Sequence, residues 1–285
     1  MTRPFLRCLA AFTLAASAAV SHATCPGDVE TAVLVARYMS LQPADNPPPM
    51  SIGDAECGRD KMVRFMEQQL GLRAGYKAGL TNPAVQKRFK HDAPVRGVLF
   101  SAMLLPDGAQ FPAKFGARPL FEADLMVRVK DEGVHDAKTP AEVLQHLEAI
   151  IPLIELPDLI VRDPSRLDGP GVASINVGAR WAVMGAEIKP TPAMEAQLAR
   201  MVVKVLDGDG RELDRGQGSD VLGHPLNAVI WLAQDVARGG GRLKRGDLLS
   251  LGSFSKLMPP KPGLWVKVVY EGLEGTPEVG VSFRE

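Results

Sequence analysis

Net charge is the first property that the sequence lacks. Its 285 residues include 33 lysines and arginines and 33 aspartates and glutamates, and no lysine- or arginine-rich block stands along the chain. A protein without a basic patch has no electrostatic footprint for nucleic acid or for an anionic membrane surface. With 46% hydrophobic residues the composition is that of a globular protein. We therefore expect a small-molecule partner and no nucleic acid.

Several familiar catalytic motifs are also missing. The sequence contains no Gly-x-Ser-x-Gly nucleophile motif, no His-Glu-x-x-His zinc motif and no Gly-x-x-x-x-Gly-Lys phosphate loop. The histidines after residue 23 show no metal-binding spacing; they are His91, His135, His146 and His224. These absences set aside the corresponding hydrolase, zinc-protease and nucleotide-binding chemistries.

Cysteine is scarce, with Cys8, Cys25 and Cys57 in the whole chain. Cys8 falls within residues 1–23, where two arginines precede an alanine-rich apolar segment that ends in Ser-His-Ala. This pattern predicts a secretory signal peptide at 1–23 and a periplasmic or secreted protein without a membrane span in its mature form. A membrane anchor is the alternative, but the apolar segment is shorter than the roughly 20 residues that a span needs.

Two cysteines, Cys25 and Cys57, would remain in the mature chain. An even number of cysteines in an oxidising compartment is compatible with one disulfide, which would tie the N-terminal arm to the helix that follows. Two separate thiols are the alternative, because a sequence does not measure the distance between them.

Two helices are predicted near the N-terminus. Apolar residues at helical spacing follow Asp28 over residues 28–41, and a second such segment with an N-terminal capping signal covers 51–70. The proline-rich linker at 42–49 separates them, because consecutive prolines cannot continue a helix. We therefore predict an N-terminal helical portion over residues 24–72.

From residue 73 to residue 285, short β-like runs separated by glycine and proline dominate. Two further helices are predicted, at 139–150 and 225–238. Segment 207–214 (DGDGRELD) favours a hairpin turn over a calcium loop, because Arg211 stands at a ligand position. Many strands with few helices favour an α+β or mixed β architecture over a regular βαβ repeat. Residues 73–285 would form one β-rich catalytic region.

Three acidic residues form the candidate site. Glu122 and Asp124 lie two positions apart on a predicted strand, so their side chains share a face. The strand is apolar on both faces beyond them, and two buried carboxylates repel each other unless a cation lies between them. Glu155, at the end of another apolar run, would complete a set of ligands for Mg²⁺ or Mn²⁺, with Ca²⁺ as an option. An edge strand with a solvated acidic face is the alternative.

Lys77 is the fourth candidate, in the segment GYKAGL. Its neighbours Gly75 and Gly79 indicate close approach of backbone or ligand. A lysine beside a bound cation could relay a proton. The alternative is a surface lysine whose stem lies along the sheet while its ammonium group reaches water.

Six segments, taken in order, resemble the blocks of a known family: GYKAGLTNPAVQKRF, APVRGVL, PLFEADLMVRV, PLIELPDL, GSDVLGHPLNAVIWLAQDVARGGGRLKRGDLLSLGS and PPKPGLWVKVVYEGL. They resemble the 2-keto-4-pentenoate hydratase group of aromatic compound catabolism. That group, with 2-hydroxyhexa-2,4-dienoate hydratases and 4-oxalocrotonate decarboxylases, belongs to the fumarylacetoacetate hydrolase superfamily. The resemblance runs from Asp54 to the C-terminus. It implies a mixed β roll with an N-terminal helical extension, and a homo-oligomer.

The resemblance also implies roles for single residues. The family's metal ligands fall on Glu122, Asp124 and Glu155, and its active-site lysine falls on Lys77. Its substrate-binding positions fall on Gly252, Ser253, Val221, Gly223 and Pro225. A divalent metal, Mg²⁺ or Mn²⁺, would bind the carboxylate and the 2-oxygen of the substrate. Lys77 would relay a proton, and water would add to the conjugated double bond.

Two departures from the family leave the activity open. Asp124 stands where glutamate is usual, and Phe100, Ser101 and Ala102 stand where hydratases have acidic residues. The resemblance implies a hydratase that makes a 4-hydroxy-2-oxo acid from a 2-hydroxy-2,4-dienoate. Decarboxylation of a 2-oxo-3-enedioate at the same site is one alternative. A catalytically silent secreted protein that binds metal or 2-oxo acids is the other.

Overall fold

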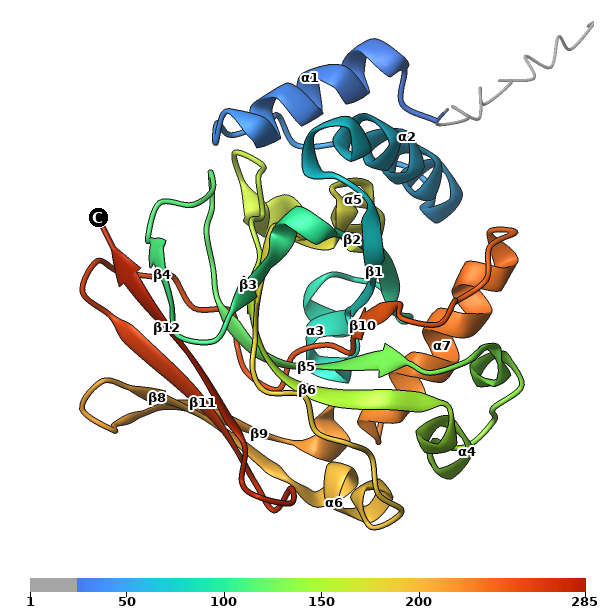
Figure 1. Cartoon of the computed structure of the whole chain (residues 1–285). Coiled ribbons are helices and arrows are strands. Elements are labelled where there is room, and N and C mark those ends of the chain that lie inside the picture. The colour runs from blue at the N-terminus through green and yellow to red at the C-terminus, as the bar shows by residue number, and fades with distance from the viewer. Residues whose placement is uncertain (1–24) are drawn as a thin grey trace, which may run out of the picture.

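Two curled β-sheets form the body of the protein in a computed structural model that describes residues 25–285 (Figure 1). The predicted signal peptide at 1–23 lies outside the described residues. The larger sheet has the strand order β2 (Val95–Phe100), β1 (Arg73–Gly79), β10 (Leu248–Ser250), β5 (Glu122–Val129), β6 (Leu147–Leu156), β7 (Trp181–Met184) and β3 (Leu104–Pro106). The smaller sheet has the order β4 (Ala109–Pro112), β12 (Glu278–Arg284), β11 (Trp265–Glu271), β8 (Val202–Asp207) and β9 (Glu212–Gln217).

Helices lie around the sheets. The α-helices of the described part are α1 (Asp28–Met39), α2 (Ile52–Leu70), α3 (Pro83–Arg88), α4 (Pro140–Gln145), α5 (Gly169–Ser174), α6 (Met194–Arg200) and α7 (Pro225–Arg238). Short 3₁₀ turns are η1 (Ser101–Met103), η2 (Glu132–His135), η3 (Pro164–Arg166), η4 (Asn176–Gly178) and η5 (Gly218–Asp220). Figure 1 shows α1 and α2 together above the larger sheet, with α4 and α6 at the opposite end. Over residues 25–285, no helix combines the length and apolar character that a membrane span needs.

The sheets are mixed, which confirms the predicted α+β class with N-terminal helices. β1 runs parallel to β10, β3 to β7 and β4 to β12, whereas the other neighbouring strands are antiparallel. β8 and β9 form an antiparallel pair around the segment 207–214, which confirms the hairpin turn predicted there.

Strand β5 lies in the middle of the larger sheet, between β10 and β6, and its apolar side chains are buried on both faces. The edge-strand alternative is therefore wrong. Tyr270 of β11 connects the smaller sheet to this centre. Its hydroxyl donates to the carbonyl of Asp124 and accepts from the Leu153 N–H at 2.9 Å. The two sheets thus meet at the backbone of Asp124 and Leu153.

Helices α1, α2 and α7 confirm three of the four predicted helices. Ser51 caps α2 by accepting a hydrogen bond from the Asp54 N–H at 3.1 Å. The cap of α1 is Gly27 and not Asp28, which is the first helical residue. Helices α3, α5 and α6 have six or seven residues each, too few for periodicity to reveal them.

The helix predicted at 139–150 is wrong in its second half. α4 ends at Gln145, and β6 begins at Leu147. Ile150 in this segment pairs with Val127 of the central strand β5. Pairing with a buried neighbouring strand therefore outweighs the helical spacing that the sequence shows, as expected for β-branched residues.

The predicted linker at 42–49 is bonded to the body of the protein. Ala44 donates its N–H to the Ile160 carbonyl at 2.9 Å and accepts the Arg162 N–H at 2.9 Å. Asn46 continues this pairing, because its side-chain amide donates to the Asp163 carbonyl at 2.7 Å and accepts the Asp163 N–H at 3.0 Å. The segment therefore holds α1 and α2 against the strand-rich region.

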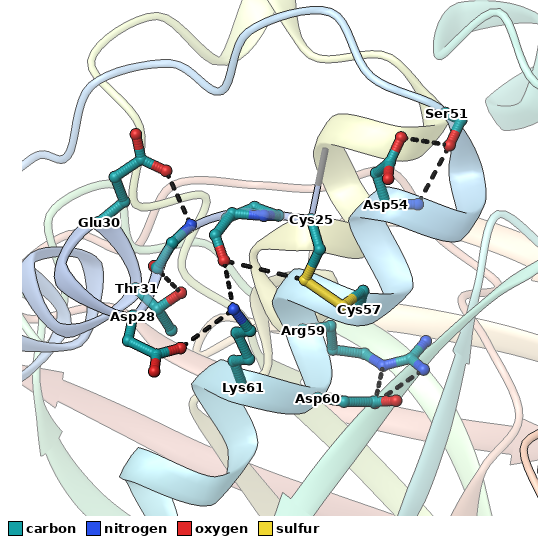
Figure 2. The surroundings of a disulfide bond; sticks show 12 residues. Cys25, Asp28, Glu30, Thr31, Ser51, Asp54, Cys57, Arg59, Asp60 and Lys61 are labelled. Carbon is teal, nitrogen blue, oxygen red and sulfur yellow. Dashed lines mark hydrogen bonds and ion pairs between the residues drawn. A yellow bond between two sulfur atoms is a disulfide. The ribbon is translucent and has the colours of Figure 1, made fainter. Parts of the chain in front are cut away.

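Cys25 and Cys57 form a disulfide that ties the start of α1 to α2 (Figure 2). Their Cα atoms lie 5.6 Å apart, the usual distance for such a bond. Lys61 supports the same corner, since its Nζ donates to the Pro26 carbonyl at 2.8 Å and pairs with Asp28 at 3.0 Å. The alternative of two unrelated thiols is therefore wrong.

Removing this disulfide is expected to lower the free energy of unfolding by roughly 2–4 kcal/mol, because it closes a loop between cysteines 32 residues apart. Urea unfolding of the double variant Cys25→Ser/Cys57→Ser measures the loss. Dithiothreitol should weaken the wild type by a similar amount and leave the double variant unchanged. Equal midpoints for the wild type and the double variant would contradict the prediction.

Candidate active site

The strands that carry the predicted acidic residues lie side by side. β5 and β6 are antiparallel neighbours in which Glu122 pairs directly with Glu155. Directly paired residues project from the same face of a sheet, and Asp124, two residues along β5, shares that face. The strand register therefore brings the three predicted ligands together on one surface.

Lys77 reaches this surface from β1, although β10 and β5 separate β1 from β6. Only 3% of the residue is exposed. Its Nζ forms an ion pair with Glu155 Oε1 and donates to the Val177 carbonyl at 3.0 Å. Gly97 on β2 leaves room for the lysine stem, because a Cβ there would lie 2.8 Å from Lys77 Cγ. The interpretation of Lys77 as a surface lysine is therefore wrong.

Asp124 is fully buried, and four donors surround its carboxylate. Oδ2 accepts from Ser250 Oγ at 2.6 Å. Oδ1 accepts backbone N–H groups from Leu125 at 2.6 Å, Leu251 at 3.2 Å and Gly252 at 2.8 Å. A carboxylate offers about four acceptor positions, so these bonds occupy Asp124. Asp124 thereby fixes the chain that follows β10.

Three carboxylates face one ammonium group, so the site has an excess of negative charge. Burial, followed by the charge of Glu155, raises the pKa of Asp124 from 3.8 to about 7. The same two causes raise the pKa of Glu122 well above its ordinary value. The site therefore favours a bound proton or a bound cation beside these residues.

Glu122 and Glu155 fit a hard divalent cation, because both offer carboxylate oxygens at a cavity and their charge exceeds that of Lys77. Asp124 fits less well, since Ser250 and backbone amides already occupy its oxygens. Across residues 25–285, no three acidic, histidine or cysteine side chains come close enough together to hold a metal ion. A metal here would take Glu122 and Glu155 as ligands, and Asp124 only after it turned from its present partners.

A cavity of about 160 Å³ opens beside these groups. Its lining combines the charged groups of Lys77, Glu122 and Glu155 with the apolar residues Phe89, Leu159, Val172 and Val177. A cavity lined by both charged and apolar groups suits a small carboxylate that carries a short hydrocarbon tail.

Gly252 and Ser253, predicted to bind substrate, line this cavity. Gly252 has a φ of 112°, and a Cβ there would lie 2.0 Å from Thr81 Oγ1. Glycine is therefore required at this position both by its backbone conformation and by the close approach of Thr81.

Val221, Gly223 and Pro225, predicted to shape the pocket, are not among the residues that line the cavity. Val221 is buried, Gly223 has a φ of 77°, and Pro225 is the first residue of α7. The segment reaches the cavity wall indirectly, through the N–H of Leu222, which donates to the Thr81 carbonyl at 3.0 Å. Its contribution is to support Thr81.

The positions that depart from the family's acidic pattern lie away from the cavity. Phe100 is fully buried, whereas Ser101 and Ala102 are exposed in η1. None of the three is among the cavity-lining residues. Their side chains therefore do not alter the set of polar groups that lines the cavity around Lys77.

The turn η4 is a part of the site that sequence reasoning missed. Val177 lines the cavity, and its carbonyl accepts a hydrogen bond from Lys77. The segment Asn-Val-Gly is typical of a turn, so the turn could have been predicted. Its contact with Lys77, 100 residues away in the sequence, could not.

Comparison with known proteins identifies the family. No protein-family model matches the chain. The 2-keto-4-pentenoate hydratase of Burkholderia vietnamiensis is 32% identical over 187 residues, which cover 66% of this chain and 70% of that protein. The chain belongs to the 2-keto-4-pentenoate hydratase family. A family member from Paraburkholderia phymatum is 30% identical over 211 residues, covering 74% of this chain and 78% of its own length.

A more distant sequence relative and two solved structures of similar fold extend the comparison. The 2-hydroxyhexa-2,4-dienoate hydratase of Comamonas testosteroni is 27% identical over 231 residues, covering 80% of this chain and 86% of that protein. The 4-oxalocrotonate decarboxylase of Pseudomonas putida G7, solved with magnesium and adipate, has a TM-score of 0.79 at 24% identity and covers 90% of this chain and 96% of its own. A fumarylpyruvate hydrolase of Pseudomonas aeruginosa, solved with Mn²⁺ and pyruvate, has a TM-score of 0.54 at 13% identity and covers 75% and 89%. The chain therefore shares its overall fold with these two enzymes, which confirms the fold that the resemblance implied.

Proposed function

We propose that the protein is a divalent-metal-dependent hydratase that converts a 2-hydroxy-2,4-dienoate into a 4-hydroxy-2-oxo acid. The observation that carries this proposal is the buried pair of Lys77 and Glu155 beside Glu122, at a cavity that apolar side chains also line. The hydratase relatives support it, because they are 32% and 30% identical to this chain over the aligned 187 and 211 residues.

The reaction adds one water and moves protons. The 2-hydroxyl group loses its proton and becomes a carbonyl, while C5 takes up a proton. The water oxygen then adds at C4, and a proton goes to C3. Lys77 is placed to give and take protons in the cavity, because its ammonium group is held between Glu155 and the Val177 carbonyl.

Glu122 and Glu155 would hold the metal. When bound, the metal would act as a Lewis acid toward the carboxylate and the 2-oxygen of the substrate. The excess negative charge of the site supports a cation there, and carboxylate ligands favour Mg²⁺ or Mn²⁺. The solved structures of similar fold that contain magnesium or Mn²⁺ also support this choice.

Incubation with 2-hydroxypenta-2,4-dienoate and Mn²⁺ tests the proposal. We expect the dienoate absorbance to disappear, NMR to show 4-hydroxy-2-oxopentanoate, and excess EDTA to stop the reaction. Calorimetric binding of oxalate without turnover of any dienoate would instead support a catalytically silent binding protein.

Decarboxylation of a 2-oxo-3-enedioate is the second candidate, and the position of Arg88 favours it. Arg88 lines the cavity and is exposed, its guanidinium carbon lies 5.3 Å from the centre of the Phe89 ring, and none of the salt bridges within residues 25–285 involves it, so it could bind a second carboxylate. The apolar side chains of Phe89 and Leu159 in the cavity lining favour a hydrocarbon tail instead. Release of carbon dioxide from 2-oxohex-3-enedioate would identify the decarboxylase.

Replacing Arg88 by glutamine distinguishes the two substrate classes. For a hydratase of monocarboxylates, we expect kcat/KM of Arg88→Gln to remain close to the wild type. For a dicarboxylate substrate, loss of a charged hydrogen-bonding partner should lower kcat/KM by about 10-fold or more. Lys87→Gln on the same helix is the matched control, because Lys87 is exposed and does not line the cavity.

We also propose that the protein acts in the periplasm or outside the cell. The disulfide between Cys25 and Cys57 supports an oxidising compartment, because such bonds are rare in the cytosol. Mass spectrometry of the protein from a periplasmic fraction would locate it and establish whether its N-terminus follows residue 23. The homo-oligomer implied by the resemblance stays a prediction.

A further inference from the structure

The turn η4 has an unfavourable backbone conformation at the edge of the cavity. Asn176 and Val177 have φ values of 55° and 54°, in the left-handed region. Asparagine tolerates this region better than most residues, whereas it is rare for a β-branched residue such as valine. Strain of this kind persists only where surrounding contacts hold it, and it often marks a functional position.

The side chain of Asn176 supplies those contacts. Asn176 is fully buried, and its Oδ1 accepts the Val98 N–H at 2.8 Å. Its Nδ2 donates to the Val98 carbonyl at 2.9 Å. One amide thus satisfies both backbone groups of a residue in β2, the strand beside the one that carries Lys77. The turn is thereby fastened to the sheet.

The same turn meets Lys77 at two points. The Val177 carbonyl accepts from Lys77 Nζ at 3.0 Å. At Gly97, a Cβ would lie 2.8 Å from the Asn176 carbonyl oxygen and 2.8 Å from Lys77 Cγ, so the turn and the lysine stem converge there. Any shift of Asn176 would therefore move the Val177 carbonyl, which accepts from Lys77, and the Asn176 carbonyl, which lies beside the lysine stem at Gly97.

We propose that Asn176 is a positioning residue that holds the ammonium group of Lys77 through the carbonyl of Val177. An ammonium group has three N–H donors. Glu155 and Val177 take two of them, which leaves the third for a ligand in the cavity. Asn176 thus sets the direction of that donor without touching a substrate. The proposal rests on the proposed function only in its effect on turnover.

The test compares Asn176→Gly and Asn176→Ala with the wild type. Both remove the side-chain amide, and glycine adopts the left-handed backbone conformation of residue 176 without strain, so this variant should fold even if the alanine variant does not. A displacement of about 1 Å in a catalytic group can cost about 10²-fold, so we expect kcat to fall by about that factor while KM changes little.

Val134→Ala is the stability control, because Val134 is fully buried in η2 and does not line the cavity. It should lower the melting temperature and leave kcat and KM unchanged. A second readout does not depend on turnover. Acylation of Lys77 by acetic anhydride, followed by mass spectrometry on the folded proteins, should be severalfold faster in both Asn176 variants and unchanged in Val134→Ala.

The outcomes separate the two proposals. If a folded Asn176 variant keeps the wild-type kcat and the wild-type acylation rate of Lys77, the positioning role is overturned. If the wild type turns over no dienoate but the Asn176 variants acylate faster, the hydratase proposal fails and the positioning role stands. If the control loses as much kcat as the Asn176 variants, their loss reflects general instability and the positioning role is rejected.

Discussion

Replacing Lys77 by methionine is expected to lower kcat by about 10²–10⁴-fold, the contribution of a positioned acid–base group. Methionine fills most of the space that the lysine stem occupies beside Gly97, but it has no proton to transfer. The substitution also leaves Glu155 buried without its cation, and breaking a buried ion pair typically costs about 3–5 kcal/mol. The single variant should therefore lose both activity and stability.

The double variant Lys77→Met/Glu155→Gln separates these two losses. Removing both charges of this ion pair leaves no unpaired carboxylate at residue 155, so the free energy of unfolding should return toward that of the wild type. Activity should stay low, because the proton-transfer group and one of the two proposed metal ligands are absent. Urea unfolding and steady-state kinetics on the wild type, both single variants and the double variant measure the two quantities. Wild-type kcat in a folded Lys77→Met protein would exclude Lys77 from the reaction.

The acidic part of the site could be predicted from the sequence because its geometry is local. Two residues that are two positions apart on a strand must share a face, and this places Glu122 beside Asp124 without knowledge of the fold. The position of Glu155 beside Glu122 does not follow from local spacing, since this pairing depends on the register of β5 and β6. That register came only with the structure, although the apolar run before Glu155 identified the strand.

The rest of the site depends on the arrangement of distant strands. The two glycines around Lys77 correctly indicated close approach, but the approaching groups are protein. A Cβ at Gly75 would lie 1.8 Å from the Leu248 carbonyl oxygen, and one at Gly79 would lie 2.3 Å from Val177 Cγ1. No pattern near Lys77 specifies β10 or η4 as these neighbours. Local sequence therefore showed where space is tight, and only the fold shows which groups fill it.

The substitution of aspartate for the family's glutamate has a structural consequence that sequence alone did not reveal. The shorter side chain keeps its charge, which led to the prediction that Asp124 binds metal. In the structure, Ser250 and the Gly252 N–H hold that carboxylate at the end of β10. Glu122 is therefore the residue of β5 with more freedom to bind a cation at the cavity.

Replacing Glu122 by glutamine is expected to change stability and activity in opposite directions. Burial and the charge of Glu155 raise the pKa of Glu122, which means that its ionised form opposes folding. A neutral amide removes that cost, so metal-free Glu122→Gln should melt at a higher temperature than the metal-free wild type at about pH 8. The amide is a poorer ligand for a hard cation, so Mn²⁺ binding and turnover should be lost.

The stability difference between Glu122→Gln and the wild type should depend on pH. With a raised pKa, the folded state binds more protons than the unfolded state over the interval between the two pKa values. Stability of the metal-free wild type should therefore fall as the pH rises from the ordinary glutamate value of 4.5 through the folded value. Asp124 acts in the same sense between 3.8 and about 7. The advantage of Glu122→Gln should consequently be small in acid and grow as the pH rises.

Glu148→Gln is the matched control, because Glu148 lies on β6 but is exposed. It should leave the melting temperature nearly unchanged across this pH range. Mn²⁺ should raise the melting temperature of the wild type and of Glu148→Gln, since a ligand that binds only the folded state stabilises it. It should have little effect on Glu122→Gln. Equal stabilisation of all three proteins would mean that the cation binds without Glu122, and lower stability of Glu122→Gln at alkaline pH would mean that the charge of Glu122 is already balanced within the protein.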